Sequence, residues 1–372
     1  MRVLFVNHTA QLGGAEHCLI DLAGILGEGC RVALLSDGPL RHRLESVGCA
    51  VQVLRGSQGL DRVRKQAGLG ALGAAIPAVL TDVRAVAGAS AAADLIWANT
   101  HKAFVVSALA GRLARKPVVY HLHDMLDRGH FSWGNRKGMV LLANTLAHRV
   151  VANSLATAQS FKALGGRPAL VEILYNGFAF EAIVPLSRPR DQRFLVGLFS
   201  RLTHWKGQHV LLDALARLDA RFHGLLVGDA LFAEDHRYLE QLRQQVHDLG
   251  LTQRVHFLGY RADARALMAT CDALVHCSVL PEAFGRVVVE GMATGRPVVA
   301  VGAGGVPEIL EDGRTGLLVP PNDALALALA LARLQADPQQ AQALGEAGRQ
   351  SVRQRFDLSQ TQQALERILG TA

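Results

Sequence analysis

Val3-Leu4-Phe5-Val6 is an apolar run that predicts a buried strand, and the residues after it decide the fold. A loop containing Gly13-Gly14 comes next, followed by an apolar pattern of helical period over residues 15–26 and a second strand-like run at residues 31–35. A strand, a helix and a strand in this order predict two parallel strands joined by a crossover helix. The opening of the chain therefore indicates an α/β protein.

The alternation of strands and helices continues and then restarts after a segment rich in proline and arginine at residues 181–193. Further strands are expected at residues 95–98, 117–121, 149–152, 170–175, 194–200, 224–228, 255–258, 273–276 and 297–301. Helices are expected at residues 207–218, 235–249 and 285–294, within the alanine-rich segment 324–348, and at residues 358–369. This pattern predicts two Rossmann-like, doubly wound domains, residues 1–180 and 181–355, which face each other across a cleft that binds ligands.

The composition argues against a disordered or membrane-spanning chain. Half of the 372 residues are apolar and 19% are charged, which is typical of a globular protein. The longest uncharged run, the 16 residues between Lys65 and Asp82, is shorter than the ~20 residues of a membrane-spanning helix. The amino terminus does not have the features of a signal peptide, and the five cysteines lack Cys-x-x-Cys spacing. We therefore expect a cytoplasmic location without a disulfide scaffold or a zinc site.

The charge is unevenly distributed. Residues 1–180 carry 19 Lys plus Arg and 11 Asp plus Glu, whereas residues 181–372 carry 20 and 21. Unless the surplus arginine only aids solubility, a basic first half predicts an anionic partner, such as a phosphorylated substrate, a membrane surface or nucleic acid. With only 20 aromatic residues and no stacking platform, nucleic acid is not expected. Contact with anionic lipid is favoured by two basic clusters beside apolar stretches: Arg62, Arg64 and Lys65, and Arg112, Arg115 and Lys116.

The most specific local pattern runs from Pro281 to Gly295, where Glu282 and Glu290 stand eight residues apart. On one continuous helix they would be separated by about 12 Å along the axis, which is wider than the ~5–9.5 Å of a glycosidase carboxylate pair. We therefore expect Glu282 in the loop before a helix and Glu290 within the helix. The backbone amides near Phe284 and Gly285 would then lie at a helix N-terminus, where phosphate or sugar oxygens bind well.

A second pattern, from Ser200 to Gly207, directly follows a predicted strand. Its cations Arg201 and Lys206 suit a pyrophosphate, because arginine presents a planar fork and lysine a point charge. A merely solvated loop would have the same composition. We expect both residues on a surface loop, so that replacing either by alanine lowers turnover far more than stability.

Three weaker patterns also follow predicted strands. Gly13-Gly14 permits a close approach of the backbone to a ligand, although any tight turn would use it, and the Gly-x-Gly-x-x-Gly fingerprint is absent. The segment from His121 to Asp124 is compatible with a metal cluster, a base or a polar wall. Glu308 follows a glycine turn and either binds ribose or sugar hydroxyls or favours a helix N-terminus. No Asp-x-Asp occurs, which counts weakly against a carboxylate-held Mg²⁺ or Mn²⁺.

Together these segments resemble the retaining glycosyltransferases of family 4, which have the GT-B fold. The resemblance covers nearly the whole chain, and its most specific part is the Glu-x7-Glu motif at Glu282 and Glu290 followed by residues 292–295. The other matching segments are Arg201…Lys206-Gly207, residues 257–260 and 304–308, Gly13-Gly14-Ala15-Glu16, His123-Asp124, Asn153-Ser154 and Tyr175-Asn176-Gly177. Gly291 stands where the family often has alanine.

The resemblance implies a role for each matching position. Arg201 and Lys206 would bind the donor diphosphate, Glu282 the donor sugar hydroxyls and Glu290 the ribose. His123 would lie beside the transferred sugar. The remaining donor-binding positions would be Gly13 and Gly14 at the diphosphate, Phe284 and Gly285 through their amides, Tyr260 and Arg261 at the nucleobase, and Glu308. The C-terminal segment, residues 356–372, would be a helix that crosses back to the first domain.

The sequence thus predicts a retaining hexosyltransferase that moves a sugar from a nucleotide-diphosphate sugar to a hydroxyl acceptor, such as a sugar, a lipid-linked sugar or a small molecule. We expect a part in cell-surface polysaccharide or glycolipid synthesis, no cofactor, no metal, and a place in the cytoplasm or on the cytoplasmic face of the membrane. Two alternatives stay open, a GT-B-fold epimerase or phosphorylase and a donor-binding scaffold without catalysis. The donor, the acceptor, the linkage and the oligomeric state are not determined by the sequence.

Overall fold

The computed structural model describes residues 1–54, 76–129, 131–181, 183, 186–187 and 192–370. The chain divides into two compact units. The first contains Met1–Phe178 and Leu358–Ala372, and the second contains Ala179–Asp357. The boundaries expected from the sequence, after residues 180 and 355, lie two residues from these positions.

The first unit is built on a parallel sheet that has seven strands in the described part of the chain, in the order β3-β2-β1-β4-β5-β6-β7. The strands are β1 (Val3–Asn7), β2 (Cys30–Leu34), β3 (Ala50–Val53), β4 (Leu95–Ala98), β5 (Val118–Leu122), β6 (Arg149–Ala152) and β7 (Val171–Ile173). All residues of β1, β4 and β5 are buried, as expected for strands covered by helices on both faces. The strand order reverses between β1 and β4, so their carboxyl ends form the topological switch point of this unit.

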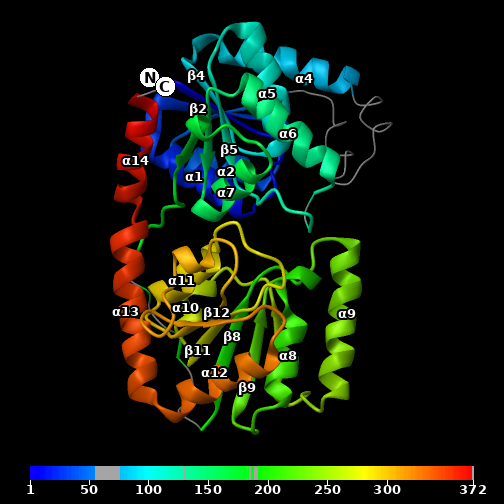
Figure 1. The fold of residues 1–372 in the computed structure, drawn as a ribbon, viewed down its shortest axis with the longest axis vertical. Helices are drawn as coiled ribbons and strands as arrows, with labels where there is room; N and C mark the ends of the chain where they lie inside the picture. The colour runs from blue at the N-terminus through cyan, green and yellow to red at the C-terminus, as the bar shows by residue number, and fades with distance from the viewer. Residues whose placement is uncertain (55–75, 130, 182, 184–185, 188–191, 371–372) are drawn as a thin grey trace. The chain divides into compact units, whose positions relative to one another are not determined.

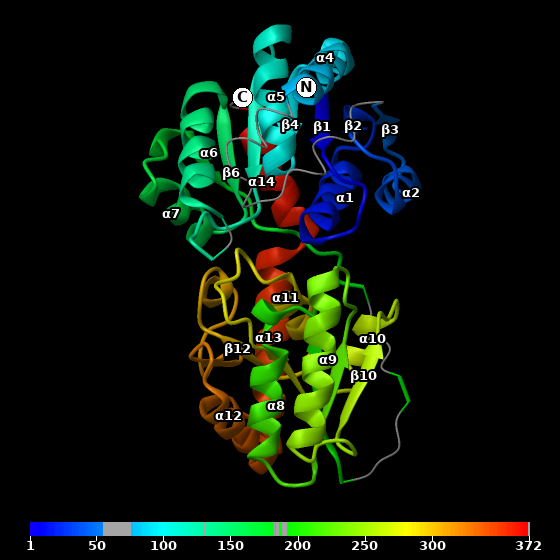
Figure 2. The ribbon, with the colours of Figure 1, turned by 90° about the vertical axis from the view of Figure 1, so that its right-hand side faces the viewer.

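Helices cover both faces of this sheet and enclose an apolar core on each side (Figures 1 and 2). One core is formed with α1 (Gly14–Leu26), α2 (Pro39–Ser46) and the C-terminal helix α14 (Leu358–Gly370). The other is formed with α4 (Ile76–Ala89), α5 (His101–Ala114), α6 (Trp133–Leu146) and α7 (Leu155–Ala163). Short 3-10 turns precede three of the strands: η1 (Gly27–Gly29), η3 (Ser90–Ala92) and η4 (Pro168–Leu170). Leu365 and Ile368 bury α14 against the first unit, although it is the last helix in the sequence.

The second unit has the same architecture. Its sheet has six parallel strands among the described residues, in the order β10-β9-β8-β11-β12-β13. The strands are β8 (Phe194–Phe199), β9 (Phe222–Val227), β10 (Val255–Gly259), β11 (Ala273–His276), β12 (Val298–Val301) and β13 (Leu317–Val319). Here the strand order reverses between β8 and β11, which places the switch point at their carboxyl ends.

The helices of the second unit also flank its sheet (Figure 2). They are α8 (Gln208–Ala216), α9 (Ala233–Asp248), α10 (Ala264–Met268), α11 (Arg286–Ala293), α12 (Ala324–Ala336) and α13 (Pro338–Phe356), with 3-10 turns η5 (His204–Lys206) and η6 (Val306–Glu308). Apolar residues of α8, α9 and α12 form the main core with the sheet. Helix α11 packs against α13, and the rings of Phe284 and Phe356 meet there edge to face, with centroids 5.5 Å apart.

The two doubly wound sheets predicted from the sequence are confirmed, and β4, β6 and β11 have the expected bounds. The short edge strands β3 and β13 were not predicted. Residues 306–308 form one 3-10 turn, not the start of a longer helix. In the part of the chain that the structure describes, no helix is both long enough and apolar enough to cross a membrane. The five cysteines are buried, and none of them forms a disulfide bond. The basic cluster Arg62, Arg64 and Lys65 lies outside the described residues.

Candidate functional site

A buried ion pair stands at the switch point of the second unit. Lys206, in the loop after β8, pairs through its ammonium group with Oε1 of Glu282, in the loop after β11. The two side chains are 16% and 12% exposed. Lys206 therefore does not lie on an exposed surface loop, and that expectation was wrong for this residue.

Two glycines let the backbone segments approach closely enough to form this pair. Gly207 follows Lys206 with φ +71°, and a Cβ atom there would lie 2.0 Å from the carbonyl oxygen of Cys277. The adjoining loops are also joined by a hydrogen bond from Val279 N to Trp205 O, 2.8 Å long. Gly304 has φ +64°, and a Cβ atom there would lie 2.1 Å from the carbonyl oxygen of Glu282. A side chain at either glycine would push apart the segments that carry the pair.

Two further polar groups contact the same carboxylate oxygen of Glu282. The Ser278 hydroxyl donates to Oε1 over 2.7 Å, and Nε2 of His276 lies 3.2 Å from it. Burial pushes the pKa of Glu282 upward, but the charge of Lys206 and the contacts with His276 outweigh this effect and hold the pKa well below its ordinary value. Glu282 is therefore a stable anion. A carboxylate stabilised in this way is a weak base and a weak nucleophile.

Arg201, the other predicted cation, has its own buried partner. Its side chain is 35% exposed, and its Nε lies 3.6 Å from Oδ2 of Asp235, which is 1% exposed. The guanidinium carbon also lies 5.3 Å from the centroid of the Phe232 ring. Arg201 and Lys206 both follow β8, on the same edge of the sheet. Gln208 donates to the carbonyl oxygen of Arg201 over 2.9 Å and so holds this loop.

The second glutamate of the motif lies within α11, as the sequence predicted. Helix α11 begins at Arg286, and the preceding residue Gly285 has a φ of +103°. Burial raises the pKa of Glu290, while the charges of Arg286, 3.8 Å away, and of Arg265 oppose the rise. The Phe284 side chain is only 3% exposed and packs in the core, so this position can serve a ligand through its backbone alone.

The other predicted donor-binding residues of this unit lie on different loops. Tyr260 follows β10 and is 75% exposed. Arg261 forms a two-pronged ion pair with Asp263 on the surface. Glu308 ends the turn η6, and its carbonyl oxygen accepts a hydrogen bond from Arg355.

In the first unit, polar side chains gather at the switch point between β1 and β4. Gly13 precedes α1 in an extended conformation, and Gly14 is the first helical residue. Neither residue has a positive φ, so the backbone conformation does not require glycine at these two positions. Asn7 ends β1, and Asn99 follows β4. The Asn99 side chain donates to Oδ1 of Asn7 over 3.0 Å, and Nε2 of His123 lies 3.0 Å from Oδ1 of Asn99. His123 is thus tied to the ends of two other strands.

The segment from His121 to Asp124 is divided between core and surface. His121 is fully buried, and burial together with the neighbouring His123 lowers its pKa well below the ordinary value. One ligand atom each of Cys18, His121 and His123 lies within 4.8 Å of the others. These donor types are ones that zinc binds, so the metal alternative for this segment stays open beside the expectation that no metal is bound. Asp124 lies 3.1 Å from Nε2 of His101.

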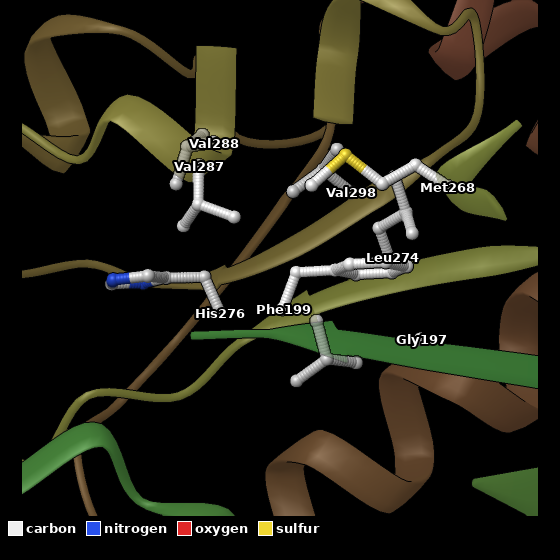
Figure 3. Close-up of a pocket in the computed structure, with 9 residues that line it drawn as sticks. Gly197, Phe199, Met268, Leu274, His276, Val287, Val288 and Val298 are labelled. Atoms are coloured by element: carbon white, nitrogen blue, oxygen red, sulfur yellow. The ribbon is translucent and has the colours of Figure 1, made fainter. Parts of the chain in front are cut away.

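A small cavity lies beside the Lys206–Glu282 pair, in the second unit (Figure 3). It is lined mainly by apolar residues under α11 and has a volume of about 10 Å³, roughly the space of one water molecule. In Figure 3 the nitrogen atoms of His276 point away from Phe199, Leu274 and Met268. The cavity is too small for a sugar, and His276 turns its polar edge toward Glu282 instead.

Sequence reasoning missed four residues of these two clusters: Asn7, Asn99, His276 and Ser278. Three of them carry a signal that was available. Asn7 and His276 end apolar strands, and Asn99 directly follows one. These positions are a signal because ligands bind at the carboxyl ends of the strands in parallel sheets. Ser278 has no comparable signal, because its hydrogen bond to Glu282 depends on the conformation of the loop between them.

Comparison with known proteins links both units to one class of enzyme. Residues 181–351 match the family model described as glycosyl transferases group 1, and residues 12–181 match the model described as glycosyltransferase family 4. The chain is 30% identical over 270 residues to a GDP-mannose-dependent alpha-(1-6)-phosphatidylinositol monomannoside mannosyltransferase of Mycolicibacterium smegmatis, covering 65% of this chain and 68% of the relative. It is 29% identical over 208 residues to the lipopolysaccharide core biosynthesis glycosyltransferase LpsE of Rhizobium meliloti, covering 55% of this chain and 58% of that relative.

Solved structures resemble the chain over its whole length. The crystal structure of Anabaena HepE in complex with UDP-glucose is 40% identical, with a TM-score of 0.89 and coverage of 100% of both chains. Sucrose-phosphate synthase from Thermosynechococcus elongatus, at 20% identity and a TM-score of 0.83, supports the fold alone. These neighbours share the GT-B fold of two Rossmann-like domains.

Proposed function

Because the chain belongs to the glycosyltransferases of group 1 and family 4, we propose that it transfers a hexose from a nucleotide-diphosphate sugar to a hydroxyl group and retains the anomeric configuration. The observation that carries this proposal is the buried cluster of Lys206, Glu282, His276 and Ser278 at the switch point of the second unit. A parallel sheet of this kind binds ligands beyond the carboxyl ends of its strands.

The chemical problem is the negative charge that develops on the departing diphosphate. Lys206 has three N–H donors, so it can keep its contact with Glu282 and still donate to a phosphate oxygen. Arg201 adds a planar fork from the same loop. Such preorganised cations stabilise charge as it forms, which lowers the barrier to breaking the bond between the sugar C1 and the phosphate oxygen. We propose no metal or cofactor for this step.

Retention follows from attack on the face that the diphosphate leaves. The acceptor oxygen bonds to C1, the bond from C1 to the β-phosphate oxygen breaks, and that phosphate takes the acceptor proton. This route needs no carboxylate nucleophile. The low pKa of Glu282 supports it, because three donors around one oxygen make Glu282 a poor nucleophile but a good acceptor for holding Lys206 and the sugar hydroxyls.

We propose UDP-glucose as the first donor to test, because the neighbour at 40% identity is in complex with UDP-glucose. Glu290 would accept hydrogen bonds from the ribose, Tyr260 and Arg261 would border the base, and Glu308 would contact hydroxyls. The amides near Phe284 and Gly285, together with Gly13 and Gly14, would approach the diphosphate and the sugar. The relatives that use GDP-mannose make that donor the main competitor.

We further propose that the acceptor belongs to a cell-surface polysaccharide or glycolipid and that the protein rests on the cytoplasmic face of a membrane. Helix α5 exposes Leu109 and Leu113, 39% and 62% respectively, with the exposed basic residues Arg112 and Arg115 beside them. Apolar and basic side chains on one helix favour an anionic lipid surface. Cosedimentation with phosphatidylglycerol vesicles at low salt tests this proposal. Leu113→Ser should weaken binding, whereas the equally exposed control Leu329→Ser should not.

The donor is tested by thermal shift and transfer assays with UDP-glucose, GDP-mannose and ADP-glucose. At about 100 times Kd, a bound donor adds about 2.7 kcal/mol to the stability. With UDP-glucose we expect both this stabilisation and sugar transfer. We also expect NMR to show that the glycosidic bond of the product has the same anomeric configuration as the donor. Lys206→Met should abolish transfer, while the surface control Arg221→Ala should not. An inverted product would refute retention, and a stabilising donor without transfer to any acceptor would favour the non-catalytic scaffold.

A further inference from the structure

A chain of buried amides connects His123 to a buried carboxylate in the first unit. The carboxylate is Glu16, 6% exposed in the first turn of α1. Nδ2 of Asn7 donates to Oε1 of Glu16 over 3.1 Å, Nδ2 of Asn99 donates to Oδ1 of Asn7 over 3.0 Å, and Oδ1 of Asn99 lies 3.0 Å from Nε2 of His123. Both asparagines are fully buried. This series of hydrogen-bonded side chains therefore runs through the protein interior, at the switch point between β1 and β4.

Two backbone carbonyl groups fix the direction of this chain. Nδ2 of Asn7 also donates to the carbonyl oxygen of Thr9 over 2.7 Å, and Nδ2 of Asn99 donates to that of Ala15 over 3.1 Å. A carbonyl oxygen only accepts, so a flipped amide would place oxygen against oxygen at either position. The oxygen of Asn99 must then face His123.

This orientation determines which nitrogen of His123 carries a proton. Since Oδ1 of Asn99 can only accept, Nε2 of His123 must be the donor. In the neutral imidazole the proton then sits on Nε2 and not on Nδ1. The carbonyl oxygen of His123 is held as well, by the side chain of Asn153 over 3.2 Å.

We propose that Glu16, Asn7 and Asn99 are positioning residues that hold His123 in the Nε2–H tautomer and in one ring orientation toward the transferred sugar. This inference rests on the proposed function, in which His123 lies beside that sugar. Glu16 is the acceptor at the far end of the chain, and the paired Asn7 amide connects it to Asn99. The two amides transmit an orientation without a net charge of their own.

The arrangement is more than core packing. Apolar residues could fill the same space without needing hydrogen-bond partners, whereas each of these buried polar groups costs stability unless it is hydrogen-bonded. Burial raises the pKa of Glu16, which the hydrogen bond from Asn7 opposes. A carboxyl group is thus kept in an unfavourable place, where backbone N–H groups of Gly13 and Glu16 and the side-chain amide of Asn7 bind it, and the Asn7 amide leads on to His123. Its position after β1 and beside Gly13-Gly14 is the edge where this class of sheet binds ligands.

The tautomer is measured by ¹⁵N–¹H NMR on the full chain labelled at histidine, and the His123→Gln variant assigns the signal. We expect wild-type His123 to show a proton on Nε2 and none on Nδ1 when neutral. Asn99→Ala should give a mixture of the two tautomers. The control Asn144→Ala removes an amide of the same unit that contacts only the 165–167 loop, and it should leave the signal unchanged. An Nδ1–H tautomer in the wild type would overturn the inference, with no assay of activity required.

The kinetic consequence is tested with the donor that the transfer assay identifies. Misplacing a reacting group can lower a rate by about 10²-fold, so we expect Asn99→Ala to lower kcat by about 10- to 100-fold with little change in the donor KM. If Asn99→Ala does not fold, Asn7→Ala, which cuts the chain one step earlier, should give a smaller loss of the same kind. An unchanged kcat together with a mixed tautomer would overturn the positioning role. Absence of transfer in the wild type with the Nε2–H signal intact would instead overturn the proposed function.

Discussion

Lys206→Met separates the charge of the ion pair from the packing of the lysine stem. Nζ of Lys206 lies 4.0 Å from the centroid of the Trp205 ring, and methionine loses this cation contact but keeps an unbranched apolar stem of similar length. Glu282 would be left as a carboxylate that is 12% exposed. Breaking a fully buried pair costs about 3–5 kcal/mol. Because Ser278 and His276 still contact Oε1, we expect a smaller loss, about 2–3 kcal/mol.

The loss is measured by urea denaturation and by thermal unfolding at neutral pH, where about 1 kcal/mol corresponds to roughly 2–4 °C for a unit of this size. The double variant with Glu282→Gln removes both charges and should recover part of the stability. The control Arg221→Ala breaks an ion pair of 2.6 Å with Asp219, in which both side chains are about half exposed. No measurable change in stability is expected for this variant. Additive effects of the two single variants, or an unchanged stability in Lys206→Met, would refute the assignment of a coupled buried pair.

Three further predictions concern charge and metal. Arg201→Ala should lower turnover by about 100-fold and stability by no more than about 1 kcal/mol, since Asp235 keeps its contacts with backbone N–H groups; a larger loss of stability than of activity, compared in the same preparation, would contradict this. Dialysis against EDTA should leave transfer unchanged, and a complete loss restored by Mn²⁺ would contradict the metal-free proposal. Burial raises the folded-state pKa of Glu290, so its carboxyl group stabilises the fold below the unfolded pKa, and this contribution is lost as the pH rises through the folded pKa. Glu290→Gln should therefore gain stability relative to the wild type between pH 4 and pH 7, with a higher donor KM; equal stability differences at both pH values would refute it.

The sequence predicted the central strands β1, β4 and β5 because they are fully buried and therefore appear as continuous apolar runs. Strand β4, for example, consists of Leu95–Ala98 and has no exposed residue. Edge strands give a weaker signal. Residues of β3 alternate between exposed and half-buried positions, and β13 has three residues. Neither is long enough to be distinguished from a loop by periodicity alone.

The site was predicted by residue type and not by pairing. Lys206 and Glu282 were each expected to bind ligand, but they are 76 positions apart, and only the folded chain shows that they bind each other. That contact explains why the lysine is buried and why the stability expectation changed. Similarly, Phe284 was expected to serve the ligand through its backbone amide, and only the folded chain shows that its ring packs edge to face against Phe356. Long-range contacts of this kind leave no local pattern in the sequence.

The two units use one topology for two different electrostatic tasks. Each sheet gathers polar side chains where its strand order reverses, but the second unit gathers charged groups and the first mainly neutral amides. In the proposed reaction, charges are needed where a diphosphate leaves, and their burial is tolerated because Lys206 and Glu282 neutralise each other. An orientation, by contrast, is best transmitted by amides, because Asn7 and Asn99 fix donor and acceptor without shifting the charge of His123. Variants in the second unit should therefore change stability as a function of charge, whereas variants of the two asparagines should change the imidazole tautomer first.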